Sequence, residues 1–98
     1  MARQYSPPAT YLAEGGTWPD GPFGPDAPVL TEAAAQYTAA VRAELERRGW
    51  SIARLARETG MTAPWASRML RGLAWADLDA VVRIERVLQV SFFPEDNA

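Results

Sequence analysis

Two short helix-forming segments separated by only three residues constrain the fold of this chain more than any other sequence feature. The first segment covers residues 52–59 and the second covers residues 63–71. Between them stand Gly60, Met61 and Thr62. Glycine supplies the left-handed backbone that a sharp bend needs, and threonine is a good N-cap for the helix that follows. The pattern therefore predicts two helices that cross at a steep angle.

Helix signals also flank this pair. Upstream, Thr31 is expected to cap a helix that ends at Gly49, and downstream Asp77 is expected to cap a helix over residues 78–89. Ser51 is the expected cap of the second helix. The side chains expected to face the core are Tyr37, Val41, Leu45, Ile52, Leu55, Ala56, Leu78, Val81, Val82 and Leu88. The sequence predicts an all-α fold of four to five helices, with no strand.

The first thirty residues differ in composition from the rest. They hold six of the eight prolines and four of the seven glycines, which oppose regular helix or central strand. They also hold apolar side chains that an ordinary solvated linker lacks, namely Tyr5, Tyr11, Leu12, Trp18 and Phe23. We therefore expect residues 1–30 to form an irregular arm that packs on the domain or on a partner. Residues 31–91 then form the helical domain, and residues 92–98 a C-terminal tail.

The distribution of charge is more informative than the net charge of −2. All ten cations are arginine, and six of them lie between Arg47 and Arg71 with Glu58 as the single acid in that interval. Acidic residues dominate the flanks. A locally basic segment in an acidic chain is typical of a protein that binds DNA.

Composition also excludes several kinds of chemistry. The chain has no cysteine and no histidine, which excludes thiolate zinc sites, catalytic cysteines and imidazole general bases. No glycine-rich loop follows a predicted strand and no metal-ligand spacing is present. We expect no enzymatic activity, no cofactor and no metal. The start lacks the apolar stretch of a signal peptide and no run is long enough for a membrane span, so we expect a soluble cytoplasmic protein.

Around the bend, the sequence resembles the lambda-repressor-like (Xre/Cro) helix-turn-helix family. The similar residues are Leu55-Ala56, Gly60-Met61-Thr62, Ser67, Gly72 and the ending Ile84 with Leu88-Gln89-Val90-Ser91. The resemblance implies a compact helical domain that binds duplex DNA, often as a homodimer on two-fold operators. It also implies that the helix over residues 63–71 enters the major groove.

The resemblance supplies a set of candidate DNA-binding residues: Arg54, Arg57, Thr62, Ala63, Pro64, Trp65, Ser67, Arg68 and Arg71. The fork of Arg68 suits guanine O6 and N7, whereas Ala63 and Pro64 offer only apolar contact, for instance to a thymine methyl. Thr62 and Ser67 are hydrogen-bonding candidates. Arg54, Arg57 and Arg71 are candidates for phosphate contacts, and the alternative for the first two is a solvated face or pairing with Glu58.

Three of the four tryptophans are candidates for particular positions, and two of them have alternative interpretations. Trp65 is a candidate to wedge against DNA, cover the arm or meet a second subunit, and core packing is the alternative. Trp75 lies in the loop after Gly72 and is expected at a dimer or DNA-backbone contact, or as a roof over the core. Trp50 is expected inside the core.

Some positions depart from the family pattern. Ile52 stands where a glutamine often contacts a phosphate, and the loop over residues 73–77 carries no cation. The favoured function is a sequence-specific transcriptional regulator, a repressor of phage, plasmid or bacterial type. One alternative is an antitoxin or inhibitor whose arm, residues 5–28, captures a partner protein. Another is a helix-turn-helix used only for protein contact.

Overall fold

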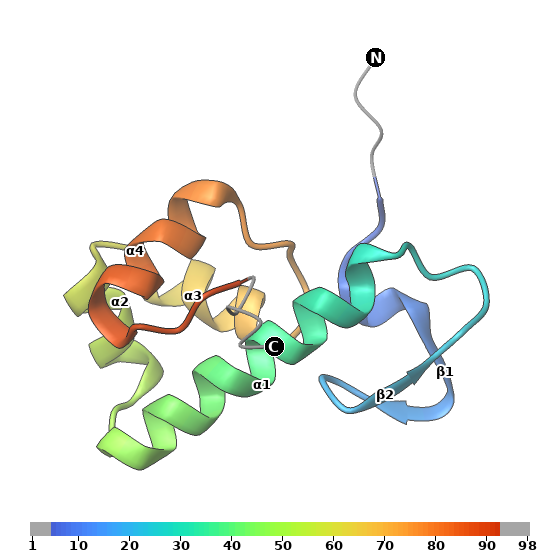
Figure 1. Cartoon of the computed structure of the whole chain (residues 1–98), viewed down its shortest axis with the longest axis horizontal. Helices are drawn as coiled ribbons and strands as arrows, with labels where there is room; N and C mark the ends of the chain where they lie inside the picture. Colours follow the sequence, from blue (N-terminus) through green and yellow to red (C-terminus); the bar gives the residue numbers. More distant parts are fainter. Residues whose placement is uncertain (1–4, 93–98) are drawn as a thin grey trace, which may run out of the picture.

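The computed structural model describes residues 5–92, so residues 93–98 of the expected C-terminal tail lie outside the described part. One long helix runs through the middle of the molecule, with three shorter helices packed against one end and a small hairpin at the other (Figure 1). The helices are α1 (Leu30–Arg48), α2 (Ile52–Thr59), α3 (Ala63–Leu70) and α4 (Leu78–Leu88). None of the helices in this part of the chain combines the length and apolar character that a membrane span requires.

The core lies between the four helices. Its buried side chains are Tyr37, Val41, Leu45, Leu55, Met69, Leu70, Ala80, Ile84 and Leu88. The predictions for α1, and those for Leu55, Ala56 and Leu88, are confirmed, but Leu78 is 82% exposed and Val82 is 43% exposed. Those two predictions were wrong because Ala80, Ile84 and Leu88, at four-residue spacing, form the inward stripe of α4.

Local signals at the helix ends are mostly confirmed. Ser51, Thr62 and Asp77 cap their helices through side-chain oxygens, which accept from Arg54 N at 3.1 Å, Trp65 N at 3.3 Å and Ala80 N at 2.8 Å, respectively. Glycines in the left-handed conformation end α1 and α2. α3 and α4 each end one residue earlier than predicted.

The predicted cap at Thr31 was wrong. α1 begins at Leu30, one residue earlier, with Val29 at the N-cap position and no side-chain cap. Thr31 lies inside the helix and is fully buried, and its hydroxyl has no partner within residues 5–92. Burial of its side chain on the inner face of α1 has overridden the local capping preference of threonine.

Residues 5–29, which precede α1, contain two paired strands, so the expectation of an irregular arm in a strandless fold was wrong. A short 3₁₀ helix, η1 (Pro8–Tyr11), leads into β1 (Leu12–Thr17), which pairs antiparallel with β2 (Gly21–Phe23). Proline cannot donate in a strand ladder, which argues against a central strand. In a two-stranded sheet both strands are edges, and Pro22 is accommodated there.

This N-terminal lobe, residues 5–28, packs on the helical domain. Ala9 N donates to Gly72 O over 2.9 Å, and the Trp18 indole covers Gly72 so closely that a Cβ there would lie 2.6 Å from Trp18 Cδ2. Phe23 meets the Trp18 ring edge-on at 5.9 Å between centroids. The lobe is therefore anchored to the loop that follows α3.

Candidate nucleic-acid interface

The bend between α2 and α3 has the geometry that its sequence predicts. Gly60 has φ of 76°, and the amide of Met61 donates to Ala56 O over 2.9 Å. Ala56 and Ala66 are buried, one on each helix, and small residues allow the helices to approach closely. The result is a helix-turn-helix in which α3 is held at a fixed angle to α2.

Arg83 of α4 secures this turn. Its guanidinium donates through Nη1 to Thr59 O, the last carbonyl of α2, over 2.9 Å, while its Nε pairs with Asp79 at 2.7 Å. A Cβ on Gly60 would lie 2.9 Å from Arg83 Nη1. Glycine suits position 60 because its backbone is left-handed, and a Cβ there would require the Arg83 guanidinium to shift.

Two further arginines bind carbonyls at the C-terminal ends of helices that are distant from them in sequence. Arg42 of α1 donates to Leu70 O, the last carbonyl of α3. Arg48 donates to Val87 O and Leu88 O at the end of α4, over 3.3 and 3.4 Å. Cations at helix C-termini satisfy free carbonyls and interact favourably with the helix dipole. Sequence reasoning missed these three positioning residues.

The predicted site residues all lie on the surface of α2, the turn, α3 and the residue after it. Seven are exposed, namely Arg54, Arg57, Thr62, Ala63, Pro64, Arg68 and Arg71, and two are half-buried, Trp65 and Ser67. The opposite side of α3 is buried through Ala66, Met69 and Leu70. We refer to the nine surface residues as the reading surface.

The arginines between Arg47 and Arg71 differ in how far neighbouring acids offset their charge. Glu44 of α1 binds Arg47 and Arg48, and the hydrogen bonds from Arg47 and then Arg48 lower the pKa of Glu44 from 4.5 to about 2. Arg54 lies 3.8 Å from Glu58 and stacks 4.5 Å above the Trp50 ring. The count of charges between residues 47 and 71 therefore overstated the free positive charge, because Glu44 lies just before that interval.

Three arginines of the reading surface keep an uncompensated charge. Arg57, Arg68 and Arg71 form no ion pair with any residue between 5 and 92. They lie on α2, on α3 and directly after α3. Free guanidinium groups of this kind suit phosphate oxygens and base edges.

Charge also separates along the molecule. Residues 5–41 contain four acids and no cation, whereas residues 42–92 contain nine arginines and six acids. The first range covers the N-terminal lobe and the first part of α1, and the second covers the helix-turn-helix. The acidic lobe and the basic reading surface are thus different parts of one folded unit.

The three tryptophans singled out in the sequence have different environments. Trp75 donates from Nε1 to Ser6 O over 2.8 Å and packs on Tyr5 at 6.1 Å between ring centroids, so its partner is the N-terminal lobe rather than the core. Trp50 is half-buried and packs against the core cluster rather than inside it, where it was expected. Trp65 is half-buried but lies outside the core cluster.

Comparison with known families agrees with this geometry. Residues 41–93, just over half of the chain, match the helix-turn-helix family model of the lambda-repressor and Xre type. The chain belongs to this family, whose members are DNA-binding regulators. Neither the curated proteins nor the solved structures yielded a match. The family match begins within α1, so the N-terminal lobe lies outside it.

Proposed function

We propose that this protein is a sequence-specific DNA-binding transcriptional repressor that inserts α3 into the major groove. The observation that supports the proposal is that one side of α3 is buried in the core and the other side is exposed. Its buried side is fixed in the core, and Arg42 fixes its last carbonyl, while its outer side presents the exposed, unpaired Arg68. A rigid helix with a free guanidinium is the device that reads base edges.

The reading surface divides into two kinds of contact. Arg68, Ser67 and Thr62 carry hydrogen-bonding groups toward bases or nearby phosphates, and Ala63 and Pro64 are exposed apolar groups suited to thymine methyls. Phosphate contacts come from arginines on both helices and after α3, which are Arg54, Arg57 and Arg71. Arg54 contributes least because Glu58 already offsets its charge.

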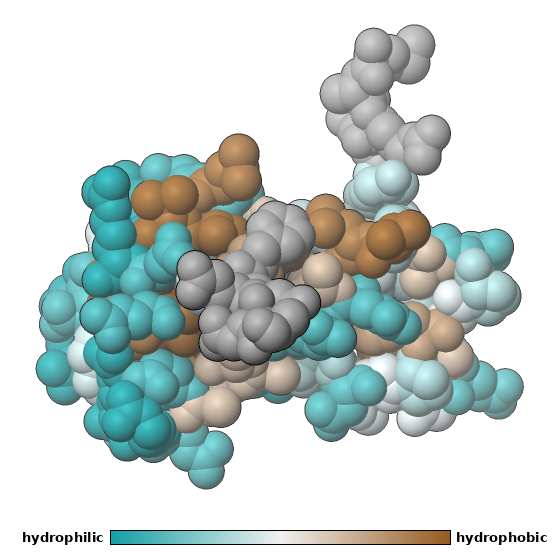
Figure 2. Space-filling view, in the orientation of Figure 1, coloured by the Kyte–Doolittle hydropathy of each residue, from teal (hydrophilic) through white to brown (hydrophobic). Residues whose placement is uncertain are grey.

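We further propose that the repressor binds as a homodimer. Apolar side chains are exposed along α4 and at the start of α1, where Leu78 is 82% and Val29 is 98% exposed. Figure 2 shows apolar surface over both places. Between them lies an apolar pocket of about 390 Å³ lined by Leu30, Ala76, Asp77, Leu78, Val81 and Phe92. Pairing two copies would remove such surface from water and give the two-fold arrangement that palindromic operators match.

Selection from randomised duplexes tests the proposal. Purified protein is mixed with the duplex pool, bound DNA is sequenced, and a two-fold motif is expected to emerge. Binding to the selected site should weaken with salt, with a slope of about −0.9 per phosphate neutralised. A pool without enrichment, or binding that salt does not affect, would instead favour a helix-turn-helix used for protein contact.

The alternative of a partner-capturing arm keeps one point of support, the acidic charge of residues 5–28. The aromatic side chains of these residues support this alternative less strongly than the sequence implied. Trp18 and Phe23 pack on each other and Trp18 covers Gly72, so these side chains serve the protein's own fold. A repressor with a structured accessory lobe therefore accounts for more of the observations.

A further inference from the structure

The C-terminal end of α3 is held by contacts from two distant parts of the chain, α1 and the N-terminal lobe. At the helix end itself, Leu73 N donates to Arg68 O over 2.9 Å around Gly72, whose φ is 74°. This is the arrangement that a glycine makes possible where a helix stops. Arg42 of α1 then donates to Leu70 O. The backbone at the end of α3 is therefore tied both to the helix and to α1.

The N-terminal lobe adds a contact on the other side of Arg71. Ala9 N, in η1, donates to Gly72 O over 2.9 Å. The carbonyl oxygens of Leu70 and Gly72, the two neighbours of Arg71, thus both accept hydrogen bonds from distant residues. A Cβ on Gly72 would lie 2.6 Å from the Trp18 ring and 2.9 Å from Ala9 Cβ. The lobe therefore fixes the position of the residue that follows Arg71.

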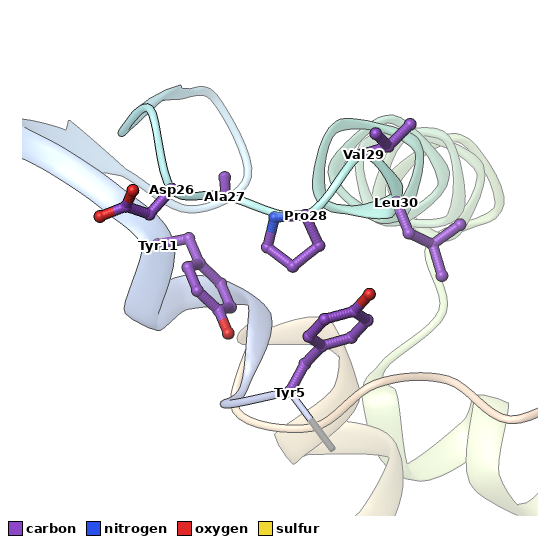
Figure 3. Close-up of a pocket in the computed structure, with 7 residues that line it drawn as sticks. All are labelled: Tyr5, Tyr11, Asp26, Ala27, Pro28, Val29 and Leu30. Atoms are coloured by element: carbon purple, nitrogen blue, oxygen red, sulfur yellow. The ribbon is translucent and has the colours of Figure 1, made fainter. Parts of the chain in front are cut away.

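The part of the lobe that makes this contact is itself held by its neighbours. The Tyr11 hydroxyl accepts from Ser6 N over 3.1 Å, and Tyr11 O accepts from Gly24 N over 2.8 Å. Ser6 O accepts from Trp75 Nε1 over 2.8 Å. Figure 3 shows the Tyr5 and Tyr11 side chains beside the segment that leads into α1. Because η1 has partners in the hairpin and in the loop after α3, it can serve as a firm support for Gly72.

The charge of the lobe argues against a role in direct contact with DNA. Residues 5–28 contain three acids, Glu14, Asp20 and Asp26, and no cation. Charge alone would therefore make the lobe oppose the binding of a polyanion. A favourable effect of the lobe on DNA binding is expected to pass through the residues that the lobe holds. The residue of the reading surface next to these contacts is Arg71, which is exposed and forms no ion pair within residues 5–92.

We propose that the N-terminal lobe is a positioning element for DNA binding, which holds Arg71 at its phosphate through the hydrogen bond from Ala9 N to Gly72 O. This inference rests on the proposed function of the reading surface. A guanidinium carried on a fixed backbone loses less freedom when it binds a phosphate than one on a mobile backbone. Ala9 and Arg42 are positioning residues in this arrangement, and Arg71 makes the contact. The lobe lies outside the family match, so this support is a feature of the present chain.

Gly72→Ala tests the proposal without changing any charge. Its methyl group would meet Trp18 and Ala9 and should push the lobe away from the carbonyl oxygen of residue 72. The full chain is titrated against the selected DNA site at several salt concentrations, at a temperature where circular dichroism shows every variant to be folded. Affinity should fall by roughly threefold to tenfold. The slope of log K against log salt should fall in magnitude by about 0.9, because one phosphate contact is lost. A purely structural role of the lobe would leave the slope of the folded protein unchanged.

Gly49→Ala is the matched control. Gly49 has φ of 69°, close to the 74° of Gly72, but a Cβ there would meet nothing within 4 Å. Gly49 follows α1 rather than α3, so this variant should keep the wild-type affinity and slope. Equal changes in the two variants would assign the effect to backbone strain and contradict the proposal. Tighter binding by Gly72→Ala would also contradict it, because that is the result that the acidic charge of the lobe predicts by itself.

A double-mutant cycle shows whether the lobe acts through Arg71. Arg71→Ala alone should lower the magnitude of the salt slope by about 0.9. Adding Gly72→Ala should then change affinity and slope little, because the contact that the lobe positions is already absent. Additive losses in the double variant would contradict the assignment to Arg71.

A second variant removes only the hydrogen bond from the lobe. Lactic acid in place of Ala9 turns the amide N–H into an ester oxygen, and it should change affinity and slope in the same direction even if Gly72→Ala does not fold. Lactic acid in place of Ala27, whose N–H donates to Gly24 O over 3.2 Å within the lobe, is the control and should bind as the wild type does. Wild-type binding by the Ala9 ester would overturn this inference alone. A wild-type protein that binds no duplex would overturn the proposed function and this inference with it.

Discussion

Arg68 and Arg86 carry the same charge on different helices, and neither forms an ion pair within residues 5–92. Replacing either with alanine changes the long-range field by the same amount. Only Arg68 lies on the reading surface, so Arg68→Ala should cost about 1–3 kcal/mol at the selected site and relax preference at one base pair. Arg86→Ala should cost far less and evenly across sequences. Gel-shift titrations on the selected site and on single-base variants measure both effects, and equal losses with intact specificity would move the reading face elsewhere.

Ala63 and Pro64 make a second prediction at the residue scale. Neither side chain has a polar group, so a contact with a base must be apolar. Replacing the contacted thymine with deoxyuridine removes one methyl and leaves base pairing intact. Affinity should fall by about 1 kcal/mol at that position. Deoxyuridine at other thymines of the same site is the control, and a site insensitive to every such replacement would exclude methyl contacts.

The Glu44 carboxylate gives a pH-dependent prediction. Its pKa is lowered from 4.5 to about 2 by Arg47 and Arg48, so its pairing stabilises the fold above pH 4.5 and is lost as pH falls towards 2. Glu44→Gln should lower the melting temperature at pH 6 and have progressively less effect as the pH approaches 2. A melting-temperature difference that stays constant from pH 6 to pH 2 would show that the ion pairs contribute nothing to stability.

What the sequence predicts at this scale depends on how local the interaction is. Ser51, Thr62 and Asp77 each cap a backbone amide three residues away, so their roles could be predicted from the local sequence. Arg42 and Arg83 bind carbonyls 28 and 24 positions away, and nothing in the neighbouring residues indicates those partners. The exposure of the reading surface was predictable because helical periodicity fixes which side of α3 faces the core.

At the scale of elements, the turn between α2 and α3 can be compared with the end of α1. Gly49 and Gly60 have φ of 69° and 76°, but a Cβ on Gly49 would meet nothing within 4 Å. Gly49→Ala should therefore cost about 1 kcal/mol from backbone strain alone. Gly60→Ala should cost more, because Arg83 must also move away from Thr59 O.

Chemical denaturation of the two alanine variants measures this difference. Adding Arg83→Ala to Gly60→Ala forms a double-mutant cycle, in which the two losses should sum to more than the loss of the double variant. Additive losses would mean that Arg83 has room to accommodate the methyl group without giving up its hydrogen bond.

The hairpin shows why some elements were not predictable. Proline and glycine were correctly judged incompatible with a helix or a central strand, but β1 and β2 are both edge strands. The sheet exists because its side chains pack, with Trp18 on Gly72 and Pro8 buried. Such contacts join the lobe to residues more than fifty positions away, so the local sequence does not contain the signal.

At the scale of the whole molecule, variants of two half-buried tryptophans distinguish an effect on stability from an effect on DNA binding. Trp18 joins the N-terminal lobe to Gly72, whereas Trp65 lies at the start of α3 outside the core cluster. Trp18→Ala should lower the free energy of unfolding by about 2–4 kcal/mol, because it removes a large side chain that packs between lobe and helical domain. Trp65→Ala should cost less stability and should weaken binding to the selected DNA site.

Because the lobe and the helices share the contacts at Gly72 and Trp75, the intact protein should unfold in one transition seen alike by tyrosine and tryptophan signals and by helical circular dichroism. In Trp18→Ala the lobe should melt before the helices, which separates the signals of Tyr5 and Tyr11 from the helical signal. A Trp18→Ala protein that keeps wild-type stability and a single transition would show that the lobe is held by η1 and Trp75 alone. The opposite ordering, with Trp65→Ala the less stable variant and Trp18→Ala the weaker DNA binder, would place the lobe rather than the start of α3 against the DNA.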